Sequence, residues 1–254
     1  SVAIGRSALK AQNFTTATST YNTAVGFVAG LSVTTGTENT LIGAAAGDAL
    51  TVGNNNVAVG YESLSSDTKG DRNVAIGRAA LQVQNFTTTT DVYNVAVGYG
   101  AGESVTTGLE NTLIGAGAGA SLTDTLGSRS TALGYAALQA QNFTTATDAY
   151  NTAVGFFAGY LVTTGVRNTL VGGLAGDALT TANNSVAVGY LALSANTGNA
   201  GNTAVGMTAL QNFNVATGSA YNTAVGAAAG GAVTSGIQNT LIGGLTGDAI
   251  TEGA

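Results

Sequence analysis

The chain of 254 residues contains no cysteine, proline, histidine or tryptophan, and only 8% of its residues are charged. Without cysteine it has no disulfides, no thiolate nucleophile and no thiolate metal ligand. Without histidine, and without paired carboxylates at matched positions, no residues are evident for general acid–base or nucleophilic catalysis. We therefore expect a protein that is not an enzyme, with no catalytic site, metal site or cofactor.

The scarcity of charge also limits the partners. The seven basic residues are scattered singly in a chain of net charge −6, which leaves no basic patch for nucleic acid. No apolar run approaches the roughly 18 residues of a membrane span, so no membrane insertion is expected in this chain. Asp48, Asp177 and Asp248 recur at matched positions, but no second carboxylate accompanies each of them, which favours turn residues over a calcium site.

A five-residue phrase that ends in glycine recurs along the whole chain. In each copy the residue before the glycine is aliphatic, Thr or Val lies three residues before it, and Asn or Ser lies four before it. Successive glycines are 17 residues apart in eight of thirteen intervals and 19 to 21 apart in the rest. A period of this length indicates a solenoid. The fourteen glycines are Gly5, Gly26, Gly43, Gly60, Gly77, Gly98, Gly115, Gly134, Gly155, Gly172, Gly189, Gly206, Gly226 and Gly243.

The phrase predicts a short strand with two distinct faces. In the copy at 22–26, Thr23 and Val25 point to one side of the strand while Ala24 and Gly26 point to the other. One strand every 17 residues leaves too little chain for ordinary helices, so the strands must stack as a parallel β-solenoid, about 4.8 Å per coil. We expect fourteen coils of 17–21 residues, with the β-branched and aliphatic side chains inside the coil and a smooth Ala/Gly face.

The two ends of the phrase have their own expected roles. The Asn at the strand entrance suits a stacked turn, since its side chain bonds local backbone groups. The Gly at the strand exit allows a sharp corner or a close approach of two backbones. Above the single coils, four coil types follow one another as A-B-C-D-A-B-C, twice, starting with an A coil at Gly5. The longer A coils contain excursions that carry the segments 12–15, 84–87, 141–144 and 211–214. We interpret this order as one continuous solenoid segment, 1–254, that is internally duplicated, about 1–129 and 130–254, and belongs to a longer fibre.

The phrases Ser1-Val2-Ala3-Ile4-Gly5 and Ser185-Val186-Ala187-Val188-Gly189, with the Asn-Thr-Ala-Val-Gly copies, resemble the head repeats (haemagglutinin-like repeats) of YadA-type trimeric autotransporter adhesins. They are also similar to repeats in phage tail fibres. The resemblance covers essentially the whole chain, and its specificity comes from the number of copies. It implies a left-handed β-roll, three chains packed side by side, and adhesion to host surfaces. It thus implies an extracellular location, on a bacterial cell surface or a phage virion.

The thin coils independently favour an oligomer. Each coil offers about three sizeable apolar side chains, and burial of each contributes roughly 1.5–3 kcal/mol. Ordering each backbone residue of a coil costs about 1–2 kcal/mol. The Ala/Gly face, for example at Ala24 and Ala58, would let neighbouring chains approach closely. We expect a homotrimer or filament, with a monomer or another assembly as the alternatives.

The long A coils contain the most distinctive side chains. Their excursions hold eight of the sixteen aromatic residues, as one Phe and one Tyr each. Two interpretations stay open: each pair packs at the base of its own loop, or the pairs form an aromatic ridge that stacks on a cell-surface glycan or receptor. The candidate surface-contact residues are Phe14, Tyr21, Phe86, Tyr93, Phe143, Tyr150, Phe213 and Tyr221.

Two functions are compatible with these features. The first is a structural and adhesive fibre segment, an adhesin head or a tail-fibre shaft, that mediates or presents attachment to a cell surface. The alternative is an ice-binding β-solenoid, because nine of the fourteen phrases place Thr at one rung position. Thr alternates there with Val, which we expect of a packed file more than of a hydrated one. Self-association and a surface glycan or receptor are the partners that the first function requires.

Overall fold

The computed structural model describes residues 1–15, 18–123, 129–215 and 218–252. In these ranges the chain contains strands, turns and bends and no helix, so the protein is all-β. It forms a parallel β-solenoid of about fourteen turns, as the repeats predict. The chain divides into two compact units, residues 1–128 with 144–147 and residues 129–143 with 148–254. The division falls next to the repeat boundary in the sequence, while the duplication itself stays a prediction.

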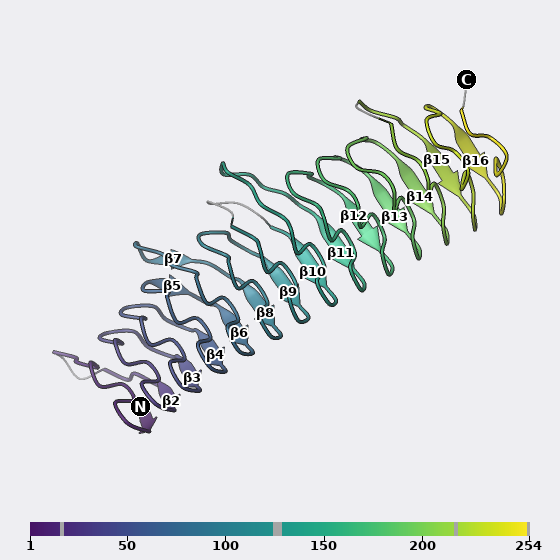
Figure 1. Ribbon diagram of the computed structural model, residues 1–254. Coiled ribbons are helices and arrows are strands. Elements are labelled where there is room, and N and C mark those ends of the chain that lie inside the picture. The colour runs from purple at the N-terminus through teal and green to yellow at the C-terminus, as the bar shows by residue number, and fades with distance from the viewer. Residues whose placement is uncertain (16–17, 124–128, 216–217, 253–254) are drawn as a thin grey trace. The chain divides into compact units, whose positions relative to one another are not determined.

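In the first unit, each turn of the chain adds one three-residue strand to a parallel sheet, and the strands lie side by side in chain order (Figure 1). A second, two-stranded sheet, β5 (Gly70–Asp71) with β7 (Thr90–Asp91), lies in the loops. The strands of the main sheet are β1 (Val2–Ile4), β2 (Thr23–Val25), β3 (Thr40–Ile42), β4 (Val57–Val59), β6 (Val74–Ile76), β8 (Val95–Val97) and β9 (Thr112–Ile114).

The second unit repeats this arrangement. Its strands also pair in chain order, and the β10–β11 connection extends further from the sheet than the β11–β12 and β12–β13 connections (Figure 1). The strands are β10 (Thr131–Leu133), β11 (Thr152–Val154), β12 (Thr169–Val171), β13 (Val186–Val188), β14 (Thr203–Val205), β15 (Thr223–Val225) and β16 (Thr240–Ile242).

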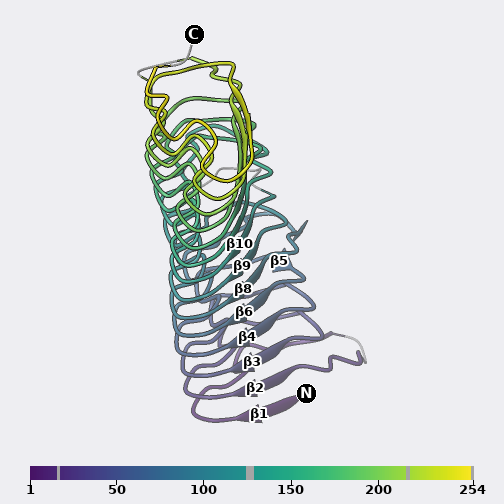
Figure 2. The same ribbon diagram turned by 90° about the vertical axis from the view of Figure 1, so that its right-hand side faces the viewer.

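All the strand pairs within each unit are in the same register. The first residue of one strand pairs with the first residue of the next, as Thr23 with Thr40 and Thr152 with Thr169. Figure 2 shows the strands of the first unit stacked in this way. Because the register repeats, each position of the phrase forms a file of side chains that runs along the stack. The files, and not single residues, are therefore the units of the packing.

The glycine at each strand exit has the two roles expected of it. All fourteen repeat glycines have a φ between +126° and +145°, a backbone conformation that side-chain-bearing residues rarely adopt. At Gly98, an added Cβ would lie 2.6 Å from the backbone of Gly115 on the next coil. The sharp corner and the close approach of two backbones therefore occur at the same residue.

The two faces of the strand are opposite to the sequence-based expectation. The middle residue of the strand is buried, as Ala24, Leu41 and Ala58 are, whereas the first and third residues lie on the outside and are partly exposed. The files of Thr, Val and Ile therefore form the outer face of the sheet, and the Ala/Leu file points into the coil. The interior of a single coil is narrow, and small residues from one side must meet Leu side chains from the other.

Leucine and glycine share one position inside the coil and together fill this interior. Leu9 lies four residues after its repeat glycine, and the equivalent position in the next coil is Gly30. A Cβ on Gly30 would lie 2.9 Å from Leu9 Cδ2 and 2.7 Å from Leu41 Cδ1. The glycine thus makes room for leucines from the coils on both sides, and the same arrangement recurs at Gly159 between Leu138 and Leu170.

A ladder of buried asparagines closes the coil beside the strand. Asn56 Nδ2 donates to the Gly70 carbonyl at 2.9 Å, and its Oδ1 accepts from the backbone N–H of Asn73 at 2.9 Å. The backbone N–H of Asn56 in turn donates to Oδ1 of Asn39 at 2.9 Å. Asn39 and Asn56 are completely buried, so their amide groups bond to neighbouring coils and not to water, whereas Oδ1 of the buried Asn73 has no hydrogen-bond partner. The expected bonding of Asn to the backbone is confirmed, but it joins coils and not one local turn.

Candidate contact surfaces

The aromatic residues of the A-coil excursions separate into two environments. Phe86, Phe143 and Phe213 are buried and Phe14 is half-buried. Their partners in sequence lie outside: Tyr21, Tyr93, Tyr150 and Tyr221 are all at least half exposed. The phenylalanines therefore pack at the base of their loops, and most of the exposed aromatic area of these excursions belongs to the tyrosines.

The tyrosines point outward because of the backbone. Tyr21 and Tyr93 have φ values of 48° and 56°, and the residue before the ladder Asn or Ser has positive φ in the other coils as well, for example Glu38 and Arg167. This left-handed position lies immediately before a buried Asn. A side chain at this position projects away from the coil, and residues of different sizes occupy it.

Two of the tyrosines lie beside an ion pair between an arginine of the preceding coil and an aspartate of their own excursion. Arg72 forms an ion pair with Asp91, and its guanidinium lies 5.6 Å from the centre of the Tyr93 ring. In the second unit Arg129 pairs with Asp148, whose Oδ2 accepts from the Tyr150 hydroxyl at 3.3 Å.

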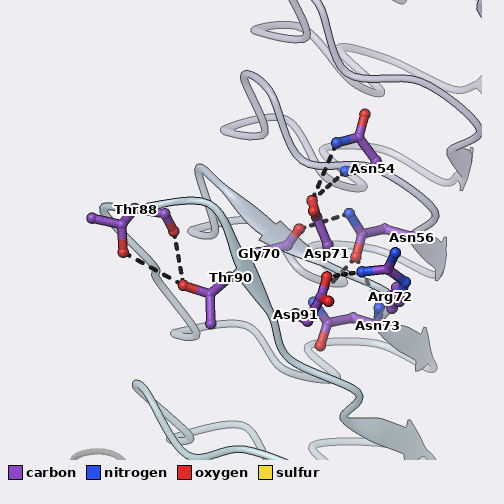
Figure 3. Close-up of polar contacts among 9 residues, drawn as sticks. All are labelled: Asn54, Asn56, Gly70, Asp71, Arg72, Asn73, Thr88, Thr90 and Asp91. Carbon is purple, nitrogen blue, oxygen red and sulfur yellow. Dashed lines mark hydrogen bonds and ion pairs between the residues drawn. The ribbon is translucent and has the colours of Figure 1, made fainter.

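The Arg72 pair lies where the small sheet joins the main one (Figure 3). Asp71 pairs with Asp91 across β5 and β7, and Asp71 Oδ1 accepts from the backbone N–H of Asn54 at 2.7 Å. The long loop that carries Tyr93 is therefore fixed to the preceding coil, which is itself bonded to the coil before it. Both partners of the ion pair are substantially exposed, so its own contribution to stability is small.

Asp67 is the one acidic side chain of the described residues that is completely buried. Its Oδ1 accepts from the backbone N–H groups of Gly70 at 3.0 Å and Phe86 at 3.1 Å, and its Oδ2 accepts from Gln84 Nε2 at 2.7 Å. Burial raises the pKa of the Asp67 carboxyl, and these hydrogen bonds oppose the rise. Because Asp67 bonds the start of the A-coil excursion at 84–86, it has a structural role.

Asp48 and Asp177 lie in the turns of their coils. Burial raises the pKa of each carboxyl, and Oδ1 of each has no hydrogen-bond partner. In the described residues no cluster of three or more acidic, His or Cys side chains is positioned to hold a metal ion. No helix long and apolar enough to cross a membrane occurs in the described part of the chain.

A second aromatic surface was missed in the sequence. The residue directly after each repeat glycine lies just past the end of its strand, and its carbonyl accepts a hydrogen bond from the following coil, as Phe27 O does from Ala45 N at 2.9 Å. We call these residues the post-glycine file. In the sequence, the position after the repeat glycine holds six of the eight aromatic residues that lie outside the A-coil excursions. The large exposed members are Phe27, Tyr61, Tyr99, Tyr135, Phe156, Tyr190 and Met207.

Arginines and rings stack within this file. The Arg6 guanidinium lies over the Phe27 ring at 5.6 Å, and Arg78 lies 5.8 Å from the ring centre of Tyr61 and 5.4 Å from that of Tyr99. Such cation–π contacts contribute roughly 0.5–1 kcal/mol each at exposed sites. The file is interrupted by Ala or Gly in every C coil, at Ala44, Ala116, Gly173 and Gly244.

Comparison with protein-family models, with curated proteins and with solved structures finds no match for this chain.

Proposed function

We propose that this chain is a segment of an extracellular fibre, an adhesin head or a phage tail-fibre shaft, that mediates or presents attachment to a cell surface. The observation that carries the proposal is the uncovered outer face of the strands. Two files, Thr or Val at the first strand position and Val, Ile or Leu at the third, are partly exposed on coil after coil. A repeating apolar surface of this kind favours burial against another protein surface.

A second copy of the same chain is the partner that fits this face best. Its surface has the same repeat, so two copies match in register over many coils, and neither carries charge on the files. Ile42, Ile76 and Ile114 each leave more than a third of their surface exposed in the single chain. Burial of such area contributes about 25 cal/mol per Å². We propose a homotrimer, with left-handed winding, as the resemblance implies, but packed through the β-branched face and not through Ala and Gly.

The association is tested on the mass of the isolated chain in solution. Light scattering should give about three times 24.7 kDa. Replacing Ile76 and Ile114 with Lys should produce a folded monomer, because both side chains lie outside the coil. The matched control is Glu110→Lys, an exposed position off the strands where the second unit carries Arg167. A wild-type monomer, or a trimer that survives both Lys substitutions, would contradict association through this face.

The adhesive role is tested by attachment of the labelled protein to bacterial cells, animal cells and a glycan array. Replacing Tyr21, Tyr93, Tyr150 and Tyr221 with Ser removes the exposed aromatic area of the A-coil excursions without entering the core. We expect attachment to weaken severalfold, because weak contacts that recur along a fibre add through multivalency. Attachment to no surface would remove the adhesive role, and attachment that the substitutions leave unchanged would place the contact elsewhere on the chain.

Ice binding is kept as a second candidate because of one observation. The Thr file lies on the outer face and is partly exposed, so the packed file expected from the sequence is wrong for these residues. In the second unit six of the seven strands begin with Thr. Measurement of thermal hysteresis decides: a freezing-point difference that Thr152→Lys and Thr169→Lys abolish would favour this candidate over the fibre.

A further inference from the structure

The post-glycine file contains one gap of the same kind in each unit. In the first unit Phe27, Ala44 and Tyr61 occupy three successive coils, and the backbone ties them in order: Ala45 N donates to Phe27 O at 2.9 Å and Glu62 N to Ala44 O at 3.0 Å. Phe27 and Tyr61 are each about half exposed. Two aromatic side chains thus project on either side of a methyl group.

The outer sides of these two rings are already occupied. The Arg6 guanidinium covers Phe27 from the coil before, and the Arg78 guanidinium covers Tyr61 from the coil after. The other faces of both rings are therefore turned toward the coil of Ala44. We call the space over Ala44 between these rings, and its equivalent in the second unit, an aromatic slot.

The second unit builds the same slot from different residues. Phe156, Gly173 and Tyr190 again occupy successive coils, with Leu174 N donating to Phe156 O at 2.9 Å and Leu191 N to Gly173 O at 3.1 Å. Tyr135 stacks on Phe156 from the coil before, with ring centres 5.6 Å apart and planes 16° apart. The outer face of Phe156 is thus covered by a tyrosine, where an arginine covers Phe27 in the first unit.

The width of the slot selects the thickness of its occupant. Rings two coils apart are separated by about 9.6 Å along the stack. Carbon atoms in van der Waals contact lie about 3.5–4.0 Å apart, so about 2 Å remains for the body of a molecule that touches both rings. A flat ring fills less of this space than a puckered six-membered sugar ring, whose axial C–H bonds extend toward both aromatic rings.

We propose that the aromatic slots bind a hexopyranose ring that is apolar on both faces, as in a β-linked glucan, an inference that rests on the proposed adhesive function and names its ligand. In β-glucopyranose all the ring substituents are equatorial, so both faces present only C–H groups to the two aromatic rings. The hydroxyls then point to the rim. In the first slot Glu62, the residue after Tyr61, accepts a hydrogen bond from Gln82 Nε2 at 2.7 Å, and its carboxylate is the acceptor for sugar hydroxyls at the rim.

The slot does not overlap the strand face that the proposed trimer covers. Its residues come directly after the repeat glycines, past the ends of the strands, whereas that face consists of the first and third strand residues. One slot recurs in each unit, so a polymeric glycan that reaches several slots of one assembly binds with a higher apparent affinity through multivalency.

The test fills the slots with a residue that the chain itself carries at this position. Ala44→Tyr and Gly173→Tyr place a ring on the floor of each slot, as Tyr61 and Tyr99 already do on their own coils. Gly173 has no positive φ. A Cβ on Gly173 would meet only the Tyr190 ring, at 3.5 Å, which is an ordinary contact, so the fold accepts the change. Ala227→Tyr is the matched control, because Met207 and Gly244 flank it and no slot forms.

The probe is cellotetraose, with saturation-transfer NMR to find the bound protons and titration for the affinity. We expect saturation of the axial ring protons, at least a tenfold weaker affinity in the double variant, and no change in Ala227→Tyr. Galactotetraose of the same linkage, whose axial hydroxyl makes one face polar, should bind more weakly.

No binding of cellotetraose at about 10 mM, or equal binding by the double variant, would overturn the slots as glucan sites. The proposed fibre function fails separately, when the wild-type protein attaches to no surface at all. Attachment to cells without binding of cellotetraose would leave the fibre function standing and remove only this inference.

Discussion

The glycine corner allows a sharp test of how the coils stack. In Gly98→Ala, the new Cβ would lie 2.6 Å from the carbonyl carbon and oxygen of Gly115, where carbon atoms in contact need about 3.5 Å. The two coils must separate locally by about 1 Å. That separation weakens the flanking ladder bonds, Val95 N to Asn111 O and Gly115 N to Val97 O, both 2.8 Å long.

The size of the effect follows from these contacts. Two or three weakened ladder bonds at about 1 kcal/mol each give about 2–3 kcal/mol. A side chain held at a φ of +141° adds strain of about 1–3 kcal/mol. We therefore expect Gly98→Ala to lower the free energy of unfolding by about 3–6 kcal/mol, measured by urea unfolding followed by far-UV circular dichroism.

The matched control is Gly117→Ala, two residues after the next repeat glycine. Its φ is +68°, but a Cβ there meets nothing within 4 Å, and the equivalent positions carry Ala45 and Ala79 with φ values of 55° and 58°. We expect a change within about 1 kcal/mol. Hydrogen exchange should show faster exchange at 95–115 in Gly98→Ala alone, because a solenoid coil depends mainly on its neighbours. Equal stability of the two variants would refute the close backbone approach as the reason for the repeat glycine.

Three further predictions concern buried polar and aromatic groups. Asn56→Ala should lower the free energy of unfolding by about 2–4 kcal/mol, because it leaves a buried carbonyl and a buried N–H unpaired. Asn56→Ser should cost less, because serine occupies the equivalent position at Ser185. An equal loss in the two variants would argue against the ladder. The pKa of Asp67 in the folded state lies above its ordinary value of 3.8. Between these two pH values the folded chain therefore binds more protons than the unfolded chain, so the free energy of unfolding should rise as pH falls through that window. The thermal midpoint should thus rise on acidification from neutral pH, and Asp67→Asn should reduce the rise; an unchanged pH profile would contradict the burial of an ionised carboxylate. Phe213→Ser should destabilise by about 3–5 kcal/mol because the ring is fully buried, whereas Tyr221→Ser should change stability little, and similar losses in both would contradict their separation.

Much of the fold is encoded in the sequence period. The fourteen repeats at 17 to 21 residues predict the number of coils, the parallel strands and their positions, because no other architecture places a strand so often in one direction. The alternation within the phrase also predicts correctly which residues share a face, as Thr23 with Val25. The corner at the repeat glycine follows from the residue type alone.

Which face is inside was decided by the tertiary structure. The alternation within the phrase does not say which face is inside. A coil with Thr23 and Val25 inside and a coil with Ala24 inside have the same sequence pattern. The choice depends on the opposite wall of the coil, where Leu9 and Leu64 fill the interior and leave space for small residues opposite them. These leucines lie in the turns, outside the repeated phrase, and they themselves have positive φ values of 49° and 50°, which sets the direction of their side chains.

The candidate contact residues show the same division between what the sequence determines and what the tertiary structure determines. The sequence alone determined that aromatic residues concentrate in the A-coil excursions, and it paired each Phe with a Tyr. Only the three-dimensional structure separated Phe213, inside the coil, from Tyr221, outside it, because a left-handed backbone at the tyrosine turns its side chain to solvent. The aromatic slots likewise need the stacking of coils, since Phe27 and Tyr61 are 34 residues apart in sequence and become neighbours only because each coil adds one step of about 4.8 Å.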